Sequence, residues 1–196
     1  MKHLAPDYVY TTDGLQANRI VSITDDGRIS SIDLREADAE QQLNESVEYL
    51  PGVALLPGFV NAHSHVFQRA LRGHTHYPLS KQDSFWTWRH AMYAEAQHLT
   101  PDLLYEGALR TYREMVAAGY TSVGEFHYVH NQPDGQPYAD PNVMSEAVLQ
   151  AGRMAGIRIV LLMAAYAQAG FHQPPQEEQL LFVDPSVEAY LTRVEA

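Results

Sequence analysis

Two histidines spaced one residue apart, His63 and His65, are the residues whose types and spacing best suit chemistry. They end an apolar run that begins at Leu55 and turns at Pro57 and Gly58. Alternate side chains of a β-strand share a face, so both imidazoles would point the same way and could meet at one point. Neutral imidazole is the commonest metal ligand in proteins. The spacing therefore predicts two ligands for one divalent metal ion, the alternative being two histidines that merely end a strand.

A metal ion held there would supply hydrolytic chemistry, because it lowers the pKa of a bound water from about 15.7 to about 7. The chain contains no cysteine, so thiolate sites and disulfides are excluded and any metal must be held by His, Asp or Glu. A second His-x-His runs from His74 to His76, but no apolar strand leads into it, so we expect a loop there.

The charge balance argues against two classes of partner. The chain carries 24 acidic and 13 basic residues, a formal net charge of -11, which repels nucleic acid and anionic membrane surfaces. The amino terminus has no apolar signal region, and no window approaches the apolar run of about 18 residues that a membrane span needs. We expect a cytoplasmic protein that binds neither nucleic acid nor membrane.

The first part of the chain, residues 1–56, is expected to be β-rich. Expected strands lie at 8–10, 19–23 and 29–32. Residues 35–48 are polar and acidic, and we interpret them as a solvated connection.

The second part, residues 57–196, alternates strands and helices. Thr100 and Pro101 mark a helix start, and Gly119 and Gly156 mark helix ends. The elements expected after the first strand are a helix over 102–118, a strand over 120–127, a helix over 140–155, an apolar strand over 157–163 of the kind buried in parallel sheets, and a helix from about 184. This alternation predicts an α/β fold with a parallel sheet.

The carboxyl ends of parallel strands are the usual place for an active site, and His65, His127 and Tyr128 all fall there. About three βα units are visible, whereas a closed barrel needs eight. We therefore expect a truncated (β/α)8 barrel.

The stretch from Pro57 to His65 resembles the first-strand motif of the amidohydrolase superfamily, whose members join a small β-sandwich to a metal-bearing (β/α)8 TIM barrel. Further stretches are similar to the formimidoylglutamate deiminases of histidine degradation. These stretches are 67–70, 83–89, 118–128 and 135–141. The resemblance implies a partial metal-dependent-hydrolase barrel over 57–196, preceded by a β-sandwich segment over 1–56.

The resemblance implies hydrolysis of N-formimino-L-glutamate to N-formyl-L-glutamate and ammonia with one divalent metal ion, usually Zn²⁺. His63 and His65 match the two first-strand ligands of the family. The other ligands and the proton-transfer groups come from later strands, and no residue here can be matched to them. We therefore expect an incomplete amino-terminal fragment that binds metal weakly and is inactive alone, and the resemblance allows a homodimer of the complete enzyme.

The resemblance also implies three substrate contacts, Gln68, Arg89 and Tyr128. The planar guanidinium of Arg89 suits a bidentate grip on a substrate carboxylate. Its alternatives are stacking on Trp86 or an ion pair with Glu95. For Gln68 and Tyr128 the alternatives are a helix-surface amide and a packed aromatic ring.

Three other polar side chains near the second strand receive a structural interpretation. His127 and His130 match no metal ligand of the family, so we take them as structural. Glu125 could point into the barrel, where a carboxylate needs a cationic or hydrogen-bonding partner. Two rival functions stay open: a deaminase or chlorohydrolase acting on a purine or triazine, and a non-catalytic metal-binding protein, since two ligands do not close a tetrahedral site.

Overall fold

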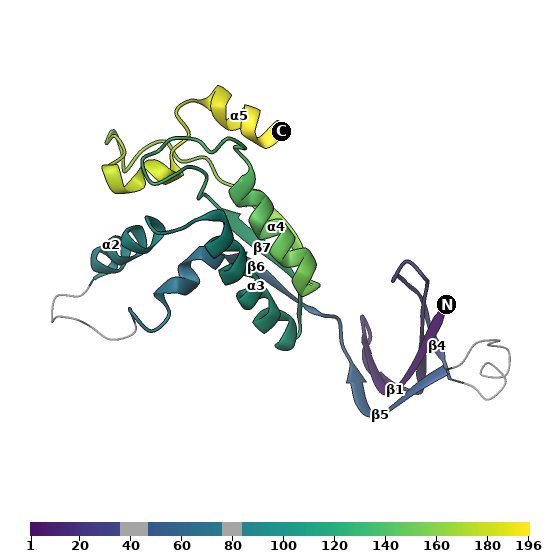
Figure 1. Cartoon of the computed structure of the whole chain (residues 1–196). Helices are drawn as coiled ribbons and strands as arrows, with labels where there is room; N and C mark the ends of the chain where they lie inside the picture. The colour runs from purple at the N-terminus through teal and green to yellow at the C-terminus, as the bar shows by residue number, and fades with distance from the viewer. Residues whose placement is uncertain (36–46, 76–83) are drawn as a thin grey trace. The chain divides into compact units, whose positions relative to one another are not determined.

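The structure is a computed structural model that describes residues 1–35, 47–75 and 84–196. The chain divides into two compact units, Met1–Pro57 and Gly58–Ala196 (Figure 1). Most of the acidic connection expected over 35–48, and His76 of the second His-x-His, lie outside the described residues. No helix among the described residues is long and apolar enough to cross a bilayer.

The first unit is a five-stranded sheet in which β1 pairs with β2, β3 and β5, and β3 pairs with β4. The strands are β1 (Lys2–Thr11), β2 (Gly14–Ala17), β3 (Arg19–Ile23), β4 (Ile29–Leu34) and β5 (Val47–Leu55). The expected β-rich character and three of the strands are confirmed. The sequence missed β5, because it lies parallel to β1 and depends on that distant pairing while carrying Pro51 and Gly52.

The second unit contains a parallel three-stranded sheet in the order β6-β7-β8. Its strands are β6 (Phe59–Ser64), β7 (Tyr120–His127) and β8 (Arg158–Met163), and the helices between them include α3 (Pro101–Ala117) and α4 (Val143–Ala155). These two helices lie side by side, with α3 against β7 and α4 against β8 (Figure 1). Their buried side chains, among them Leu104, Ala108, Met144, Val148 and Ala151, form the core beneath the sheet.

Local capping explains where these helices begin. The Thr100 hydroxyl accepts a hydrogen bond from the Leu103 backbone N–H at 3.2 Å and starts α3 as expected. The helix expected from 140 starts three residues later, at Val143. Before it the chain forms a turn, in which the Asp140 Oδ1 accepts from the Asn142 backbone N–H at 2.9 Å, and the Asn142 side chain donates to the Arg193 carbonyl at 2.9 Å.

The strand β8 corrects one expectation. Its side chains are alternately exposed, with Val160 at 62% and Leu162 at 42% exposure. Ile159 and Leu161, which alternate with them, pack against the core. Among the described residues only one face of β8 is covered, so the apolar run is not buried on both sides as the sequence suggested.

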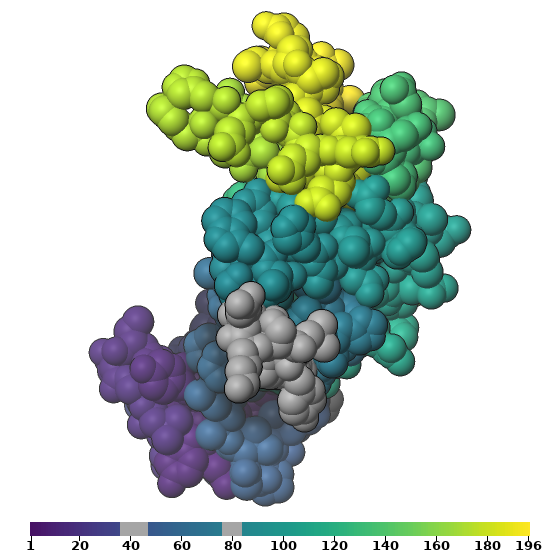
Figure 2. All heavy atoms as spheres, turned by 90° about the vertical axis from the view of Figure 1, so that its left-hand side faces the viewer, coloured from purple at the N-terminus to yellow at the C-terminus, as the bar shows by residue number. Residues whose placement is uncertain are grey.

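Three shorter helices bring further side chains beside the sheet. The 3-10 helix η1 (Val66–Leu71) directly follows β6, and α2 (Phe85–Ala96) begins at Ser84, whose hydroxyl accepts from the Trp86 N–H at 3.2 Å. The 3-10 helix η2 (Glu177–Phe182), drawn yellow-green in Figure 2, lies against α2. There the Gln97 side chain donates to the Glu178 carbonyl at 3.0 Å.

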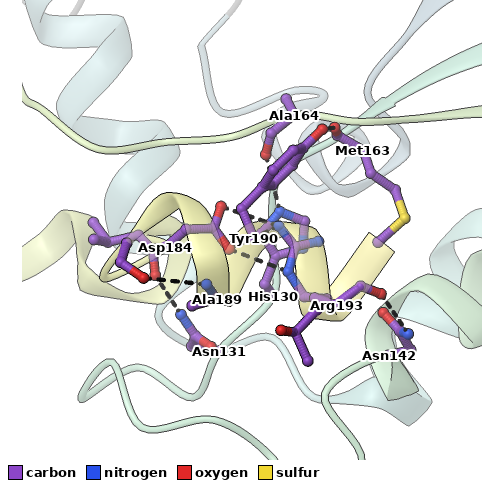
Figure 3. A network of polar contacts seen from close by, with 12 residues as sticks. His130, Asn131, Asn142, Met163, Ala164, Asp184, Ala189, Tyr190 and Arg193 are labelled. Atoms are coloured by element: carbon purple, nitrogen blue, oxygen red, sulfur yellow. Dashed lines mark hydrogen bonds and ion pairs between the residues drawn. The ribbon is translucent and has the colours of Figure 1, made fainter. Parts of the chain in front are cut away.

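The last helix, α5 (Val187–Glu195), is anchored by a buried polar network (Figure 3). Arg193 and Asp184 form an ion pair with bonds of 2.8 and 3.0 Å from Nη2. Tyr190 donates its hydroxyl to the Met163 carbonyl at 2.9 Å. These bonds fix α5 to the end of β8 and hold the chain that leaves this strand.

Candidate functional site

The two predicted metal ligands lie side by side. The ring centroids of His63 and His65 are 4.6 Å apart and their planes meet at 84°. His63 belongs to β6, whereas His65 follows the end of that strand at Ser64 and flanks η1. The strand is therefore one residue shorter than the motif, but the two imidazoles still converge.

The orientation of His65 is set by a backbone group. Its Nδ1 lies 2.9 Å from the carbonyl oxygen of Phe126, and because a carbonyl only accepts, Nδ1 carries the hydrogen. Burial lowers the pKa of His65, the hydrogen bond to Phe126 opposes that effect, and the neighbouring His63 adds to it. The ring is therefore neutral near pH 7 and Nε2 keeps a lone pair, the form in which histidine binds metal.

The donor set fits a metal ion in part. The two imidazoles supply two nitrogen ligands of the right chemistry. Among the residues that the structure describes, no group of three or more His, Cys, Asp or Glu side chains is placed to hold a metal ion. The described part of the chain therefore offers a pair of ligands and not a closed site.

A pocket of about 390 Å³ opens beside the histidines and brings together four of the five predicted site residues. These four are His65, Gln68, Arg89 and Tyr128. His65 directly precedes η1, Gln68 lies on η1, Arg89 lies on α2, and Tyr128 follows the end of β7, so the fold assembles them from three separate segments. The rest of the wall is mostly apolar and aromatic, with Phe85, Trp88, Met92, Tyr93, Phe126 and Tyr166.

Gln68 and Tyr128 contact each other in this wall. The Gln68 side-chain amide donates to the Tyr128 hydroxyl at 3.1 Å. Burial raises the pKa of Tyr128 to about 12, so the phenol keeps its proton near pH 7. Tyr128 also packs edge-on against the His65 and Phe67 rings, with centroids 5.4 and 5.2 Å apart. It is thus a packed aromatic ring whose protonated hydroxyl accepts from Gln68 at the pocket.

Arg89 is held by two phenols. Its Nε donates to the Tyr93 hydroxyl and its Nη2 lies 3.4 Å from the Tyr166 hydroxyl. Burial lowers the pKa of Arg89, but hydrogen bonds to Tyr93 and Tyr166 outweigh that effect and raise it. The guanidinium also lies 5.6 Å from the Trp86 ring centroid, so the expected stacking alternative occurs together with pocket exposure. The other alternative is not found, because the ion pair described for Glu95 is with His74 at 3.4 Å.

The sequence missed Tyr93, Tyr166 and Gln179 as part of this site. Gln179 donates its amide to the Tyr93 and Tyr166 hydroxyls at 2.7 and 2.9 Å. The i,i+4 spacing of Arg89 and Tyr93 on one helix was a signal that could have linked those two. Tyr166 and Gln179 reach the site from the loop after β8 and from η2, and no local spacing reveals that.

Glu125 faces away from the pocket, which corrects its expected direction into the barrel. It shares a face of β7 with buried Val123, while Phe126 on the opposite face lines the pocket. Its Oε1 accepts from the Val66 backbone N–H at 2.7 Å, so the expected hydrogen-bonding partner is confirmed. Burial raises the pKa of Glu125, and its hydrogen bonds, with that from Val66 foremost, oppose this effect.

His127 and His130 are buried outside the pocket, with ring centroids 5.1 Å apart. The Nε2 of His130 lies 3.2 Å from the Ala164 carbonyl oxygen and therefore carries the hydrogen. Burial lowers the pKa of His127 well below its usual value and that of His130 to about 3, and the charge of Arg193 adds to both effects. Both rings are neutral near pH 7.

The model of the amidohydrolase family matches residues 54–195, which include the histidine pair and the whole pocket. The chain belongs to the amidohydrolase family. The mixed α/β fold, with a parallel sheet in the matched region, agrees with that assignment.

Several known proteins resemble the chain to different degrees. The formimidoylglutamate deiminase of Pseudomonas aeruginosa is 48% identical over 141 residues, which are 71% of this chain and 31% of that protein. The crystal structure of an amidohydrolase from Brucella melitensis has a TM-score of 0.89 and 32% identity, covering 100% of this chain and 42% of that one. The zinc complex of atrazine chlorohydrolase from Arthrobacter aurescens has a TM-score of 0.70 and 19% identity, covering 98% of this chain and 41% of that one, and shows a shared fold.

This amidohydrolase chain therefore spans about a third of the length of the deiminase and about two fifths of each of the two solved structures. The pocket lies entirely within the Gly58–Ala196 unit.

Proposed function

We propose that the complete enzyme carrying this chain hydrolyses N-formimino-L-glutamate to N-formyl-L-glutamate and ammonia. The observation that carries the proposal is the shared pocket, in which the Arg89 guanidinium lies together with the metal-ligand candidate His65. A cation at one end of a hydrolytic site suits a substrate that bears carboxylates. The 48% identity to the Pseudomonas deiminase supports the same substrate.

His63 and His65 would hold one divalent metal ion, with Zn²⁺ as the expected metal. When bound, such an ion supplies the activation of water that attack on an amidine carbon requires. The hydrogen bond from His65 Nδ1 to the Phe126 carbonyl orients Nε2 for that ligation. In the zinc-complexed chlorohydrolase relative the same fold accommodates zinc.

The other pocket residues would bind and orient the substrate. Arg89 would grip a carboxylate with two parallel N–H groups. Tyr128 receives the Gln68 amide at 3.1 Å and keeps its own proton, which it can donate to a substrate oxygen or nitrogen. Fixing the glutamate end in this way would hold the formimino carbon near the histidine pair.

We also propose the architecture that the family implies. Gly58–Ala196 would be the first part of a (β/α)8 barrel, since three parallel strands each lead into a helical segment. Met1–Pro57 would belong to the small β-sandwich that accompanies such barrels. The remaining ligands and proton-transfer groups would then come from further strands.

A second candidate is hydrolysis of a heteroaromatic substrate such as a triazine or purine. The aromatic wall favours it, because Phe85, Trp88 and Phe126 could stack on a flat ring. A cation in the same wall has less use for such a neutral ring, so we rank this candidate second.

Product release by the full-length gene product separates the candidates, measured as ammonia for the amidine and the aminopurine and as chloride for the chlorotriazine. N-formimino-L-glutamate, an aminopurine nucleoside and a chlorotriazine would be supplied in turn, before and after removal of metal by a chelator. We expect turnover of the formimino compound only, and its loss with the metal. Turnover of the heterocycles alone would contradict the proposed reaction. Deimination by the isolated 196-residue chain would contradict only our expectation that this chain is inactive by itself.

A further inference from the structure

The guanidinium of Arg89 has one edge occupied and one edge free. Nε and Nη2 form the edge that meets the Tyr93 and Tyr166 hydroxyls. No described residue forms a hydrogen bond with Nη1. Since Arg89 lines the pocket, the Nη1–Nη2 edge is the one available to a ligand.

Gln179 can only donate to the two phenols. Its Oε1 accepts from the Gln176 backbone N–H at 2.8 Å, which fixes the direction of the amide. Both hydrogens of Nε2 then point to hydroxyl oxygens, Tyr93 at 2.7 Å and Tyr166 at 2.9 Å. Gln179 therefore supplies hydrogens to the cluster and accepts none from the phenols.

Counting hydrogens leaves the Tyr166 O–H without an acceptor among the described residues. A hydroxyl oxygen has two lone pairs, and those of Tyr93 receive Arg89 Nε and Gln179 Nε2. Tyr93 therefore accepts no hydrogen from Tyr166 in their 3.4 Å contact, and the two lone pairs of Tyr166 face Gln179 Nε2 at 2.9 Å and Arg89 Nη2 at 3.4 Å. Tyr166 cannot return a hydrogen to Tyr93, and no other described residue accepts one from it.

The charge of the pocket agrees with a surplus of donors. Arg89 is cationic, burial raises the pKa of Tyr166 to about 12, and none of the described residues that line the pocket is an Asp or a Glu. The ring of Tyr166 packs on Phe182 with centroids 5.7 Å apart, and its backbone carbonyl accepts from the Asp184 N–H at 2.9 Å. Tyr166 is thus held from below while its hydroxyl reaches the pocket.

We propose that Tyr166 is a substrate-binding residue that donates its hydroxyl hydrogen to the same carboxylate that Arg89 grips. Tyr93 and Gln179 are positioning residues, which orient the Arg89 guanidinium and the Tyr166 hydroxyl through their hydrogen bonds. The ligand class is a carboxylate, and the inference deepens the proposed function, on which it rests for the identity of the substrate.

Binding of two matched probes to the full-length protein tests this inference. Glutarate carries carboxylates and glutaramide replaces them with neutral amides of similar shape. The wild type and Tyr166→Phe would be compared by calorimetry with both probes. We expect Tyr166→Phe to weaken glutarate binding about tenfold and glutaramide binding much less, since a hydrogen bond to a charged acceptor is the stronger one.

A second tyrosine serves as the matched control. Tyr105→Phe removes a phenolic hydroxyl from α3, outside the pocket, and should leave both affinities unchanged. Equal weakening of both probes by Tyr166→Phe, or no weakening, would overturn the inference. The Phe side chain keeps the ring contact with Phe182, and an unchanged unfolding temperature shows that the fold is intact.

The outcome is separable from that of the proposed function. If the wild type prefers glutarate through Tyr166 but releases no ammonia from N-formimino-L-glutamate, the carboxylate site stands and the proposed reaction fails. If ammonia is released while Tyr166→Phe leaves both the probe preference and KM unchanged, the reaction stands and this inference fails.

Discussion

The Nδ1 atom of His65 donates a hydrogen bond of 2.9 Å to the carbonyl oxygen of Phe126, on the strand next to that of His63. Two neighbouring strands thus cooperate: β6 brings the imidazoles together, and β7 decides which nitrogen of His65 is free. Such bonds to a ligating histidine fix its tautomer and raise its affinity for metal. The pair is therefore prepared for a cation before one binds.

Zn²⁺ should bind His63 and His65 at lower concentrations than it binds the other histidines. In a titration of the chain with Zn²⁺, the imidazole NMR signals of His63 and His65 should shift together and first. His65→Ala should weaken binding at least tenfold, because it removes one of two ligands. The control is His74→Ala, at a residue that pairs with Glu95 in a different region. Unchanged binding in His65→Ala would contradict the assignment.

Replacing Arg89 by lysine should keep the positive charge but remove the planar guanidinium and its parallel N–H donors. Lysine cannot hold the two phenols and grip a carboxylate with two parallel bonds. In the full-length enzyme we expect Arg89→Lys to raise KM for N-formimino-L-glutamate about tenfold to 100-fold, the worth of one charged hydrogen bond. Arg72→Lys, at an exposed residue that pairs with Glu114, is the control. Equal kinetics in both variants would remove Arg89 from the binding site.

The sequence predicted those parts of the molecule that local signals determine. Thr100 with Pro101 located the start of α3, and the left-handed glycine Gly156 located the end of α4. The paired histidines were visible because strand alternation is itself a local pattern. The start of α4 was misplaced by three residues, because the Asp and Pro at 140 and 141 form a turn closed by the Asp140 side chain and not the first turn of the helix.

The hidden part of the site depends on long-range packing. Glu125 and Phe126 alternate along β7, and the sequence alone did not tell which face the helices would cover. Tyr166 and Gln179 lie on irregular chain and on a 3-10 helix, where residue spacing carries no information about the partners. Only the folded arrangement brings the Tyr166 hydroxyl to Arg89 and the Gln179 amide to Tyr166.

Acid should destabilise the fold through the buried histidines. The pKa of His130 is about 3 in the fold against 6.5 in the unfolded chain, so below pH 6.5 the unfolded state binds more protons. The contribution of His130 to the free energy of unfolding is then fully present above about pH 6.5 and is lost as the pH drops toward 3. Between pH 7.5 and 5.5, urea unfolding of the wild type should lose about 1 kcal/mol more than that of His130→Asn.

The control for this pH effect is His98→Asn, which replaces an exposed histidine and leaves the buried pair intact. Its stability should follow the wild type across the same range. Glu125 acts in the opposite direction, because its raised pKa lets the fold hold a proton that the unfolded chain has lost. Identical slopes in the wild type and His130→Asn would show that His130 does not titrate on unfolding.

Replacing one partner of the Asp184–Arg193 ion pair (Figure 3) should lower the free energy of unfolding more than replacing both partners with apolar residues. Asp184 and Arg193 are 9% and 6% exposed, so Asp184→Asn would leave a buried guanidinium without its counter-charge. We expect a loss of about 3 to 5 kcal/mol in the free energy of unfolding, measured in urea. The double variant Asp184→Leu with Arg193→Met should recover part of that loss. A cost below about 1 kcal/mol for Asp184→Asn would mean that water satisfies Arg193.

Two neighbouring residues of β8 should respond in opposite ways to the same change. Val160 is 62% exposed on the open face of the sheet, and β8 pairs only with β7 among the described residues. An apolar face and a free strand edge favour self-association, so we expect the isolated chain to form oligomers or aggregates. Val160→Thr should reduce the sedimenting mass at a given concentration with little loss of stability.

Ile159→Thr should instead lower the unfolding temperature, because Ile159 packs into the space that Gly152 leaves on α4. A monodisperse wild-type monomer that unfolds cooperatively would contradict the prediction that the exposed face of β8, which carries Val160, drives self-association.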